Sequence, residues 1–151
     1  MTQQIVQATP ESVDDWLPLF SAYLDFYQVA QSREHCRDYL RQRLSQRQAL
    51  VFVAGDADGP NGFVLLYPGY SSLSLQPCWI LNDLFVSPKA RGRGVAGQLI
   101  ERAQRHMREL GGGELMLQTA HDNLTAQRLY ESLGFALDRE FRVYYWNSER
   151  S

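Results

Sequence analysis

The most informative part of the sequence is residues 81–100, L-N-D-L-F-V-S-P-K-A-R-G-R-G-V-A-G-Q-L-I. An apolar strand leads into a loop with glycines at positions 92, 94 and 97, and the loop opens directly onto an amphipathic helix. The first amides of a helix have no intrahelical partner and carry partial positive charge. Glycines let a bulky anion approach these amides, and Arg91 and Arg93 add full charges. The combination predicts a phosphate-binding helix N-terminus, against the plainer interpretation of a tight surface turn.

The segments on either side predict alternating strands and helices. Helical spacing of apolar residues predicts helices over 9–27, 32–47, 94–110 and 124–133. Apolar runs bounded by turn residues predict strands over 5–8, 49–54, 62–70, 79–86, 114–119, 135–138 and 141–146. Hairpin strands come early and strand–helix–strand units later, so we expect an α+β fold with a central twisted mixed sheet and about four flanking helices. Residues 1–151 are expected to form a single domain.

Composition narrows the class of protein. The 151 residues are 44% hydrophobic and 21% charged, values typical of a globular domain. A net charge of -2 argues against a general nucleic-acid binder, which is usually basic. Two cysteines form no disulfide framework or zinc cluster, and no apolar stretch is long enough to span a bilayer. We therefore expect a cytoplasmic protein with no metal, no membrane partner and no nucleic-acid partner.

The glycine pattern alone leaves two classes of phosphate ligand open. Gly92-x-Gly94-x-x-Gly97 formally matches the dinucleotide fingerprint of an NAD-binding domain. However, five residues separate the strand from Gly92, and the ribose-binding acid is missing where Gln118 and Thr119 stand. A nucleotide-binding oxidoreductase is therefore the weaker alternative. A Walker-type loop is excluded because the chain has no Gly-Lys-Ser/Thr.

Two motifs resemble a known family. The stretch R-G-R-G-V-A, Arg91 to Ala96, resembles the coenzyme-binding signature of the GNAT superfamily of acetyl-coenzyme A-dependent N-acetyltransferases. The stretch H-D-N-L-T-A-Q-R-L-Y-E-S-L-G-F, His121 to Phe135, resembles its second motif. The resemblance implies transfer of an acetyl group to a primary amine by direct attack in a ternary complex. L-N-D-L-F-V followed by P-x-x-R-G is similar to the branch that acetylates polyamines, small amines, amino acids and some histone tails.

The resemblance implies how the coenzyme is held. Parallel strands of this fold splay apart, which leaves backbone groups of Leu84, Phe85 and Val86 to pair with pantetheine. Amides of the glycine loop would bind the pyrophosphate and polarise the thioester carbonyl. Asn123 would bind pantetheine, although a plain helix cap explains it equally well. The implied coenzyme-binding residues are Leu84, Phe85, Val86, Arg91, Gly92, Arg93, Gly94, Val95, Ala96, Gly97, Asn123, Ala126 and Tyr130.

Tyr130 and Asp83 are the candidate catalytic residues. By the second motif, Tyr130 would give its proton to the leaving thiolate, although helical periodicity also allows a core aromatic there. Asp83 interrupts an apolar strand, and it would either attract the cation of the amine, take its proton through water, or simply be satisfied by local amides. The strand glutamate that acts as base in one branch of the superfamily is replaced by Ile80, which disfavours a histone-type mechanism. Asp25 and its aromatic neighbours are further candidates for an amine pocket, or plain core residues of a helix.

A cysteine-based enzyme, a non-catalytic coenzyme-binding protein and a homodimer are three further possibilities. A nucleophilic triad of Cys78, His121 and Asp122 has no support in the local sequence. A non-catalytic protein of the same fold that binds acyl-coenzyme A remains an alternative. The resemblance also implies a possible homodimer, in which the aromatic strand over 143–146 would pair across an interface.

Overall fold

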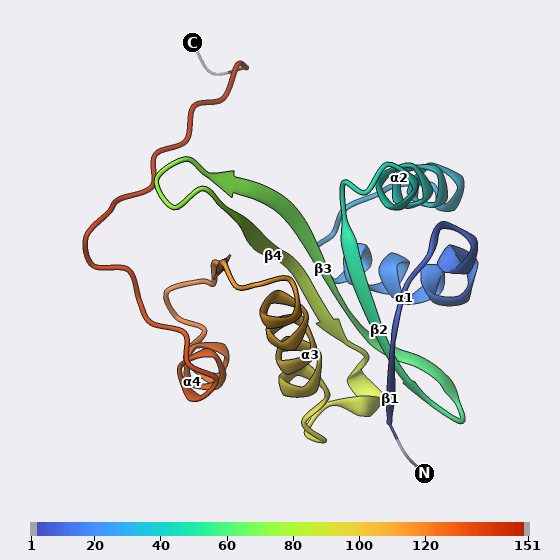
Figure 1. Ribbon diagram of the computed structural model, residues 1–151. Helices are drawn as coiled ribbons and strands as arrows, with labels where there is room; N and C mark the ends of the chain where they lie inside the picture. Colours follow the sequence, from blue (N-terminus) through green and yellow to red (C-terminus); the bar gives the residue numbers. More distant parts are fainter. Residues whose placement is uncertain (1–2, 150–151) are drawn as a thin grey trace. The chain divides into compact units, whose positions relative to one another are not determined.

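The computed structural model describes residues 3–149, which form two compact units with the boundary between Gln118 and Thr119. The first unit contains a five-stranded sheet in the order β1-β2-β3-β4-β5. Strands β1 to β4 are labelled in Figure 1. Strands β1 to β4 pair antiparallel with their neighbours, and β5 pairs parallel with β4, so the sheet is mixed as expected. The strands are β1 (Gln4–Gln7), β2 (Leu50–Asp56), β3 (Gly59–Ser71), β4 (Gln76–Val86) and β5 (Glu114–Met116).

Four α-helices accompany the strands in the described residues, as the sequence predicts. The first unit has α1 (Val13–Phe26), α2 (Arg33–Ser45) and α3 (Val95–Glu109), and the second has α4 (Leu124–Ser132). Short 3-10 turns, η1 (Pro10–Ser12) and η2 (Pro88–Ala90), precede α1 and the glycine loop. The sheet separates α1 and α2 on one face from α3 on the other (Figure 1).

The face covered by α1 and α2 is held by an aromatic core. The apolar spacing along α1 puts Trp16 and Phe20 on one side of the helix, and both rings contact the fully buried Phe63 of β3. Leu40 of α2 and Leu65 of β3 are buried in the same cluster. This packing fixes α1 against the middle of the sheet. It therefore also fixes the side chains at the C-terminal end of α1 relative to β3 and β4.

Helix α2 is also tied to α1 by charge. Arg37 Nε and Arg41 donate to the carboxylate of Asp14 at 2.6 and 2.9 Å. Asp14 belongs to α1, so these two ion pairs join the two helices. Arg37 holds the pKa of the Asp14 carboxyl below its usual value.

The apolar face of α3 packs on the opposite side of the sheet. Leu99 and Ala103 are fully buried there, as the helical spacing predicts, whereas Leu110 lies beyond the helix end and is about half exposed. Gly62 of β3 allows the close approach, because a Cβ there would lie 3.1 Å from Val95 and 3.2 Å from Leu99. The strand to which Gly62 belongs thus sets how closely the start of α3 approaches the sheet.

The strands predicted over 135–138 and 141–146 are wrong. These residues form no strand, and the strand predicted over 114–119 is shortened to β5. Aromatic and β-branched residues express a preference for extended backbone, but a strand also needs a partner for its ladder of hydrogen bonds. The structure shows no such partner for these residues within 3–149. Within the same described range, no helix has the length and hydrophobicity needed to cross a membrane.

We expect Phe63→Ala to lower the free energy of unfolding by about 3–5 kcal/mol, because it leaves a cavity in the aromatic core. The matched control is Leu73→Ala, since Leu73 is 99% exposed in the β3–β4 turn. The control should change the free energy of unfolding by less than about 0.5 kcal/mol. Urea denaturation followed by tryptophan fluorescence measures both, and equal effects would contradict the assigned core.

Candidate functional site

Strand β4 is paired on both sides over only part of its length. Its register with β3 runs from Gly62↔Val86 to Ser71↔Gln76, whereas β5 meets it only at Cys78, Trp79 and Ile80. From Leu81 onward, no strand among residues 3–149 continues the ladder on the β5 side. This is the parting of parallel strands that the resemblance implies. It leaves one edge of the backbone at 84–86 without a ladder partner.

A bulge in β4 lies at the same place. Leu65 pairs with Asp83 and Leu66 pairs with Leu81, so Asn82 is an extra residue opposite β3. A bulge re-aims the side chains that follow it. Asp83 and Phe85 therefore share the α1 face with Leu65 and Phe63, because opposite residues of an antiparallel pair point to the same side.

The glycine loop forms the N-terminus of α3. Gly92 and Gly94 have φ values of 78° and 77°, a left-handed conformation that other residues rarely adopt. Gly94 is the N-cap of α3 and caps it without a side-chain hydrogen bond. The first turn of the helix also contains no acidic residue. The amides at 95–97 are therefore suited to an external anion, as the sequence predicts for a phosphate site.

The two arginines of the loop are used differently. Arg91 Nε donates to the backbone carbonyl of Val86 at 3.0 Å, and its guanidinium lies 5.8 Å from the ring centres of Phe26 and Phe85. Arg93 is exposed in the loop. The contact between Arg91 and Val86 was not predicted. The backbone carbonyl of Val86, one of the groups expected to pair with pantetheine, already accepts a hydrogen bond from Arg91.

Asp83 is the centre of a polar cluster beneath α1. Its Oδ1 accepts a 2.5 Å hydrogen bond from the phenol of Tyr23, and its Oδ2 accepts one from Asn82 Nδ2 at 3.0 Å. Burial and then the Asp83 carboxylate raise the pKa of Tyr23, which remains a neutral donor. Nearby, the phenols of Tyr39 and Tyr67 lie 2.7 Å apart, and burial raises the pKa of Tyr67.

The sequence identified Asp83 but not the partners that hold it. Tyr23 belongs to the aromatic run that the sequence singled out, but nothing local connects it to a residue 60 positions away. Asp25, the other acid considered for an amine pocket, is exposed on α1. Asp83, which is hydrogen-bonded to the phenol of Tyr23, is therefore the better candidate than Asp25 for an amine pocket.

The second unit contains the remaining predicted residues. Asn123 is the N-cap of α4, where its Oδ1 accepts from the amide of Ala126 at 3.2 Å. Tyr130 is half-buried, and its ring centre lies 6.0 Å from that of Phe135. The helix ends before Gly134, whose φ of 95° suits a helix terminus. The capping role considered for Asn123 is thus present.

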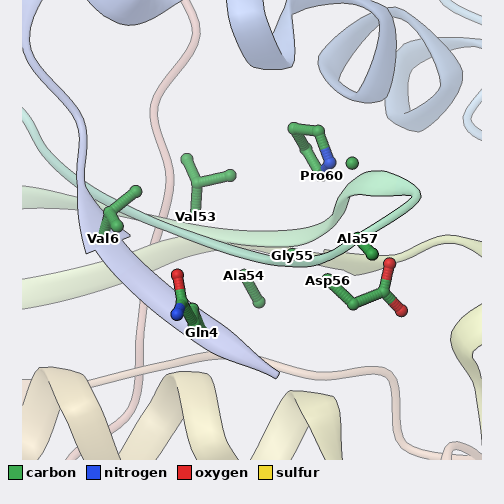
Figure 2. Close-up of a pocket in the computed structure, with 9 residues that line it drawn as sticks. Gln4, Val6, Val53, Ala54, Gly55, Asp56, Ala57 and Pro60 are labelled. Carbon is green, nitrogen blue, oxygen red and sulfur yellow. The ribbon is translucent and has the colours of Figure 1, made fainter. Parts of the chain in front are cut away.

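The described residues contain no metal-binding cluster, and the hollow that they form lies away from the predicted site. No three His, Cys, Asp or Glu side chains within residues 3–149 are grouped to hold a metal ion. Figure 2 shows a shallow hollow beside the β2–β3 turn, which contains none of the predicted site residues. It is lined by Gln4, Val6, Val53, Ala54, Gly55, Asp56, Ala57, Gly59 and Pro60.

A family comparison decides the class of protein. The model of the acetyltransferase (GNAT) family matches residues 16–135, a range that crosses the boundary between the two units. The chain belongs to the GNAT family of acetyltransferases. It is 38% identical over 130 residues to the uncharacterized N-acetyltransferase YhfO of Bacillus subtilis, covering 86% of this chain and 87% of the relative.

Further relatives of this acetyltransferase agree in sequence and in structure. It is 30% identical over 142 residues to a probable acetyltransferase of Haemophilus influenzae, covering 93% of this chain and 95% of that protein. The crystal structure of a probable acetyltransferase superposes with a TM-score of 0.89 at 39% identity. That superposition covers 95% of this chain and 97% of the other. The α+β fold predicted from the sequence is therefore confirmed.

We expect Gly94→Asp to weaken binding of coenzyme A to this GNAT enzyme by at least about tenfold relative to Gly94→Asn. Both side chains tolerate the left-handed conformation and both cap helices, so the pair differs mainly in charge. The carboxylate would occupy the anion site and repel phosphate, whereas the amide would not repel it. Isothermal titration calorimetry measures the two dissociation constants, and equal values would contradict an anion site at α3.

Proposed function

We propose that this GNAT enzyme transfers the acetyl group of acetyl-coenzyme A to a primary amine of a small molecule or peptide. The observation that supports the proposal most is the continuous path from the unpaired edge of β4 into the glycine loop at the start of α3. Pantetheine carries amides, so it can pair with an open strand edge. Pyrophosphate is an anion, so it can bind the helix N-terminus that follows.

The proposed coenzyme contacts follow the chain from β4 to α3. Backbone groups of Leu84 and Phe85 would pair with pantetheine, and the amides at 93–97 would hold the pyrophosphate. Because Arg91 Nε already bonds Val86, the other guanidinium nitrogens of Arg91 are the ones left to meet phosphate. In the second motif, Asn123 caps α4 with Oδ1. Its Nδ2 is the donor that we propose for a pantetheine carbonyl, with Ala126 beside it on the same helix.

The chemistry is direct transfer between two bound substrates. The neutral amine attacks the thioester carbon, the carbonyl oxygen gains negative charge, and the carbon–sulfur bond then breaks. Backbone amides near the end of β4 would stabilise the developing oxyanion. The sulfur leaves as a thiolate that takes the phenolic proton of Tyr130, and the amine loses its proton to water. The products are an N-acetylated amine and coenzyme A.

The acceptor site has to accommodate a positively charged amine. An alkyl amine with a pKa near ~10 is almost entirely cationic at pH 7. Asp83 is the carboxylate that the structure holds at the bulge of β4, with the aromatic end of α1 next to it. We propose that the acceptor amine meets the enzyme there.

A coenzyme titration separates this function from its alternatives. Binding of acetyl-coenzyme A without binding of NAD supports the proposal, and binding of NAD alone would replace it with a dinucleotide-binding function. Turnover of any amine in a panel of polyamines, amino acids, aminoglycosides and peptides would exclude a purely non-catalytic acyl-coenzyme A binder.

We expect Tyr130→Phe to lower kcat by about 10²–10⁴-fold while the affinity for acetyl-coenzyme A stays unchanged, because only proton donation is lost. The matched control is Tyr70→Phe, since Tyr70 is 85% exposed and lies outside the proposed sites. It should keep full activity. A thiol-release assay gives kcat, calorimetry gives the affinity, and an unaffected kcat in Tyr130→Phe would assign Tyr130 to packing.

We also propose that the enzyme is a cytoplasmic homodimer that pairs through its C-terminal segment. Within the second unit, aromatic and aliphatic side chains over 141–146 are 64–84% exposed, which is unusual for a stable surface. Aromatic side chains bury roughly 150–250 Å² each, so one segment offers about the 800 Å² per partner of a standard interface. The exposed residues are Phe141, Val143, Tyr144, Tyr145 and Trp146.

We expect the parent to sediment as a dimer, and Val143→Asp/Trp146→Asp to shift it to the monomer because charge replaces apolar contact area. Ser148→Asp adds charge just beyond the exposed segment and should leave the dimer intact. Sedimentation velocity measures all three proteins. A monomeric parent would refute the proposed dimer without affecting the proposed acetyl transfer.

A further inference from the structure

The carboxylate of Asp83 is held rather than left to rotate. One oxygen accepts the 2.5 Å hydrogen bond from Tyr23, and the other accepts the 3.0 Å bond from Asn82. Each oxygen keeps a second lone pair for another donor. Hydrogen bonds from these two donors fix the direction in which the remaining lone pairs of the carboxylate point.

The residue that fixes Asp83 is itself immobilised by the core. The ring of Tyr23 contacts Phe20, Phe63 and Phe85 at centroid distances of 6.0, 5.5 and 5.8 Å. Phe63 is fully buried, and Phe85 is 7% exposed. The phenol of Tyr23 therefore stands in one place relative to β4. Its hydrogen bond therefore restricts the rotation of the Asp83 carboxylate at the bulge.

The surroundings of this carboxylate favour a positive ligand. Phe26 and Tyr27 are 62% and 61% exposed, although they adjoin the buried aromatic cluster through Phe85 and Tyr23. The C-terminal end of α1 lies in the same place, and its last turn contains no basic residue. Aromatic faces, the negative end of a helix and a carboxylate all attract cations. The guanidinium of Arg91 lies 5.8 Å from the ring centres of Phe26 and Phe85, so those two rings already face one cation.

We infer that Asp83 is the anion that binds the ammonium form of the acceptor amine, and that Tyr23 is the positioning residue that aims this anion. The inference rests on the proposed acetyl transfer and specifies its acceptor site. The ligand class is a primary alkylammonium whose N–H groups reach the free lone pairs of the carboxylate. Phe26 and Tyr27 line the approach to it.

This assignment distinguishes an anchor from a base. A base and an anchor at Asp83 would both use the free lone pairs of the carboxylate, and they differ in whether the amine proton is transferred to it. An anchor needs both bonds intact, because they orient the carboxylate. Removing the phenol should therefore weaken binding of the amine and leave the chemical step largely unchanged.

Steady-state kinetics test the positioning role. We expect Tyr23→Phe to raise KM for the amine about tenfold, with kcat within about twofold and KM for acetyl-coenzyme A unchanged. Asp83→Asn should raise KM for the amine more strongly. The double variant should match Asp83→Asn alone, because Tyr23 acts only through Asp83. The matched control is Tyr70→Phe, an 85% exposed tyrosine of β3, which should behave as the parent.

A fall in kcat without a change in KM would overturn the inference and make Tyr23 catalytic. Independent effects that add in the double variant would also overturn it, because Tyr23 would then act on something other than Asp83. A circular dichroism melt of each variant identifies loss of fold. If Tyr23→Phe fails to fold, the comparison of Asp83→Asn with the parent decides, and an unchanged KM for the amine there refutes the anchor.

An equilibrium measurement separates this inference from the proposed reaction. Butylammonium is titrated into the coenzyme A-loaded parent and into Asp83→Asn at pH 7, and binding is followed by NMR shifts. We expect saturable shifts in the parent that weaken at least tenfold in the variant. Acetylation of an amine without these shifts refutes the anchor and leaves the reaction standing. Shifts without turnover on any amine refute the reaction and leave the ammonium site standing.

Discussion

Strand β4 has ladder partners on both sides only over Cys78–Ile80, and the functional end of the first unit depends on that constraint. Backbone groups that lose a sheet partner need another one. Along the unpaired part of β4, some of that demand is met within the chain, since Arg91 donates to the carbonyl of Val86. The rest is open to a ligand with amides of its own. The early end of β5 thus leaves the strand edge on which the proposed coenzyme site depends.

In the proposed function, the two faces of β4 serve different substrates, the coenzyme on one face and the acceptor amine on the other. The glycine loop that follows β4 leads to α3, which packs on one face of the sheet with Leu99 and Ala103 in its contact. The opposite face receives α1, and there the bulge at Asn82 turns Asp83 toward Tyr23. Because Asp83 and the proposed phosphate site belong to β4 and its immediate continuation, the spacing between these two within the first unit is set by backbone geometry. Rigid elements of this kind hold reacting groups better than free loops do.

Local pattern predicted most of the elements of this chain, and contacts between distant residues explain what it missed. The glycines before α3 and the apolar spacing along it are local signals, and both match the structure. The bond between Tyr23 and Asp83 joins positions 60 apart, and it depends on how α1 crosses the sheet. The strands predicted over 135–138 and 141–146 were wrong for a related reason. Their aromatic and apolar residues favour extended backbone, but whether a strand forms also depends on a second segment that pairs with it. The roles of Asn123 and Tyr130 come from a motif and stay predictions.

The chain puts opposite charges at the two ends of the proposed reaction. The start of α3, with Arg91 and Arg93, suits the phosphates, whereas Asp83 and the C-terminal end of α1 suit an ammonium. An anchor for the ammonium has a cost, because stabilising the cation opposes the loss of the proton that the attack requires. The gain has to come from orientation, which lets the small neutral fraction of bound amine react as soon as it forms. A carboxylate aimed by a buried phenol provides that orientation without taking the proton itself, so the proton must leave through water.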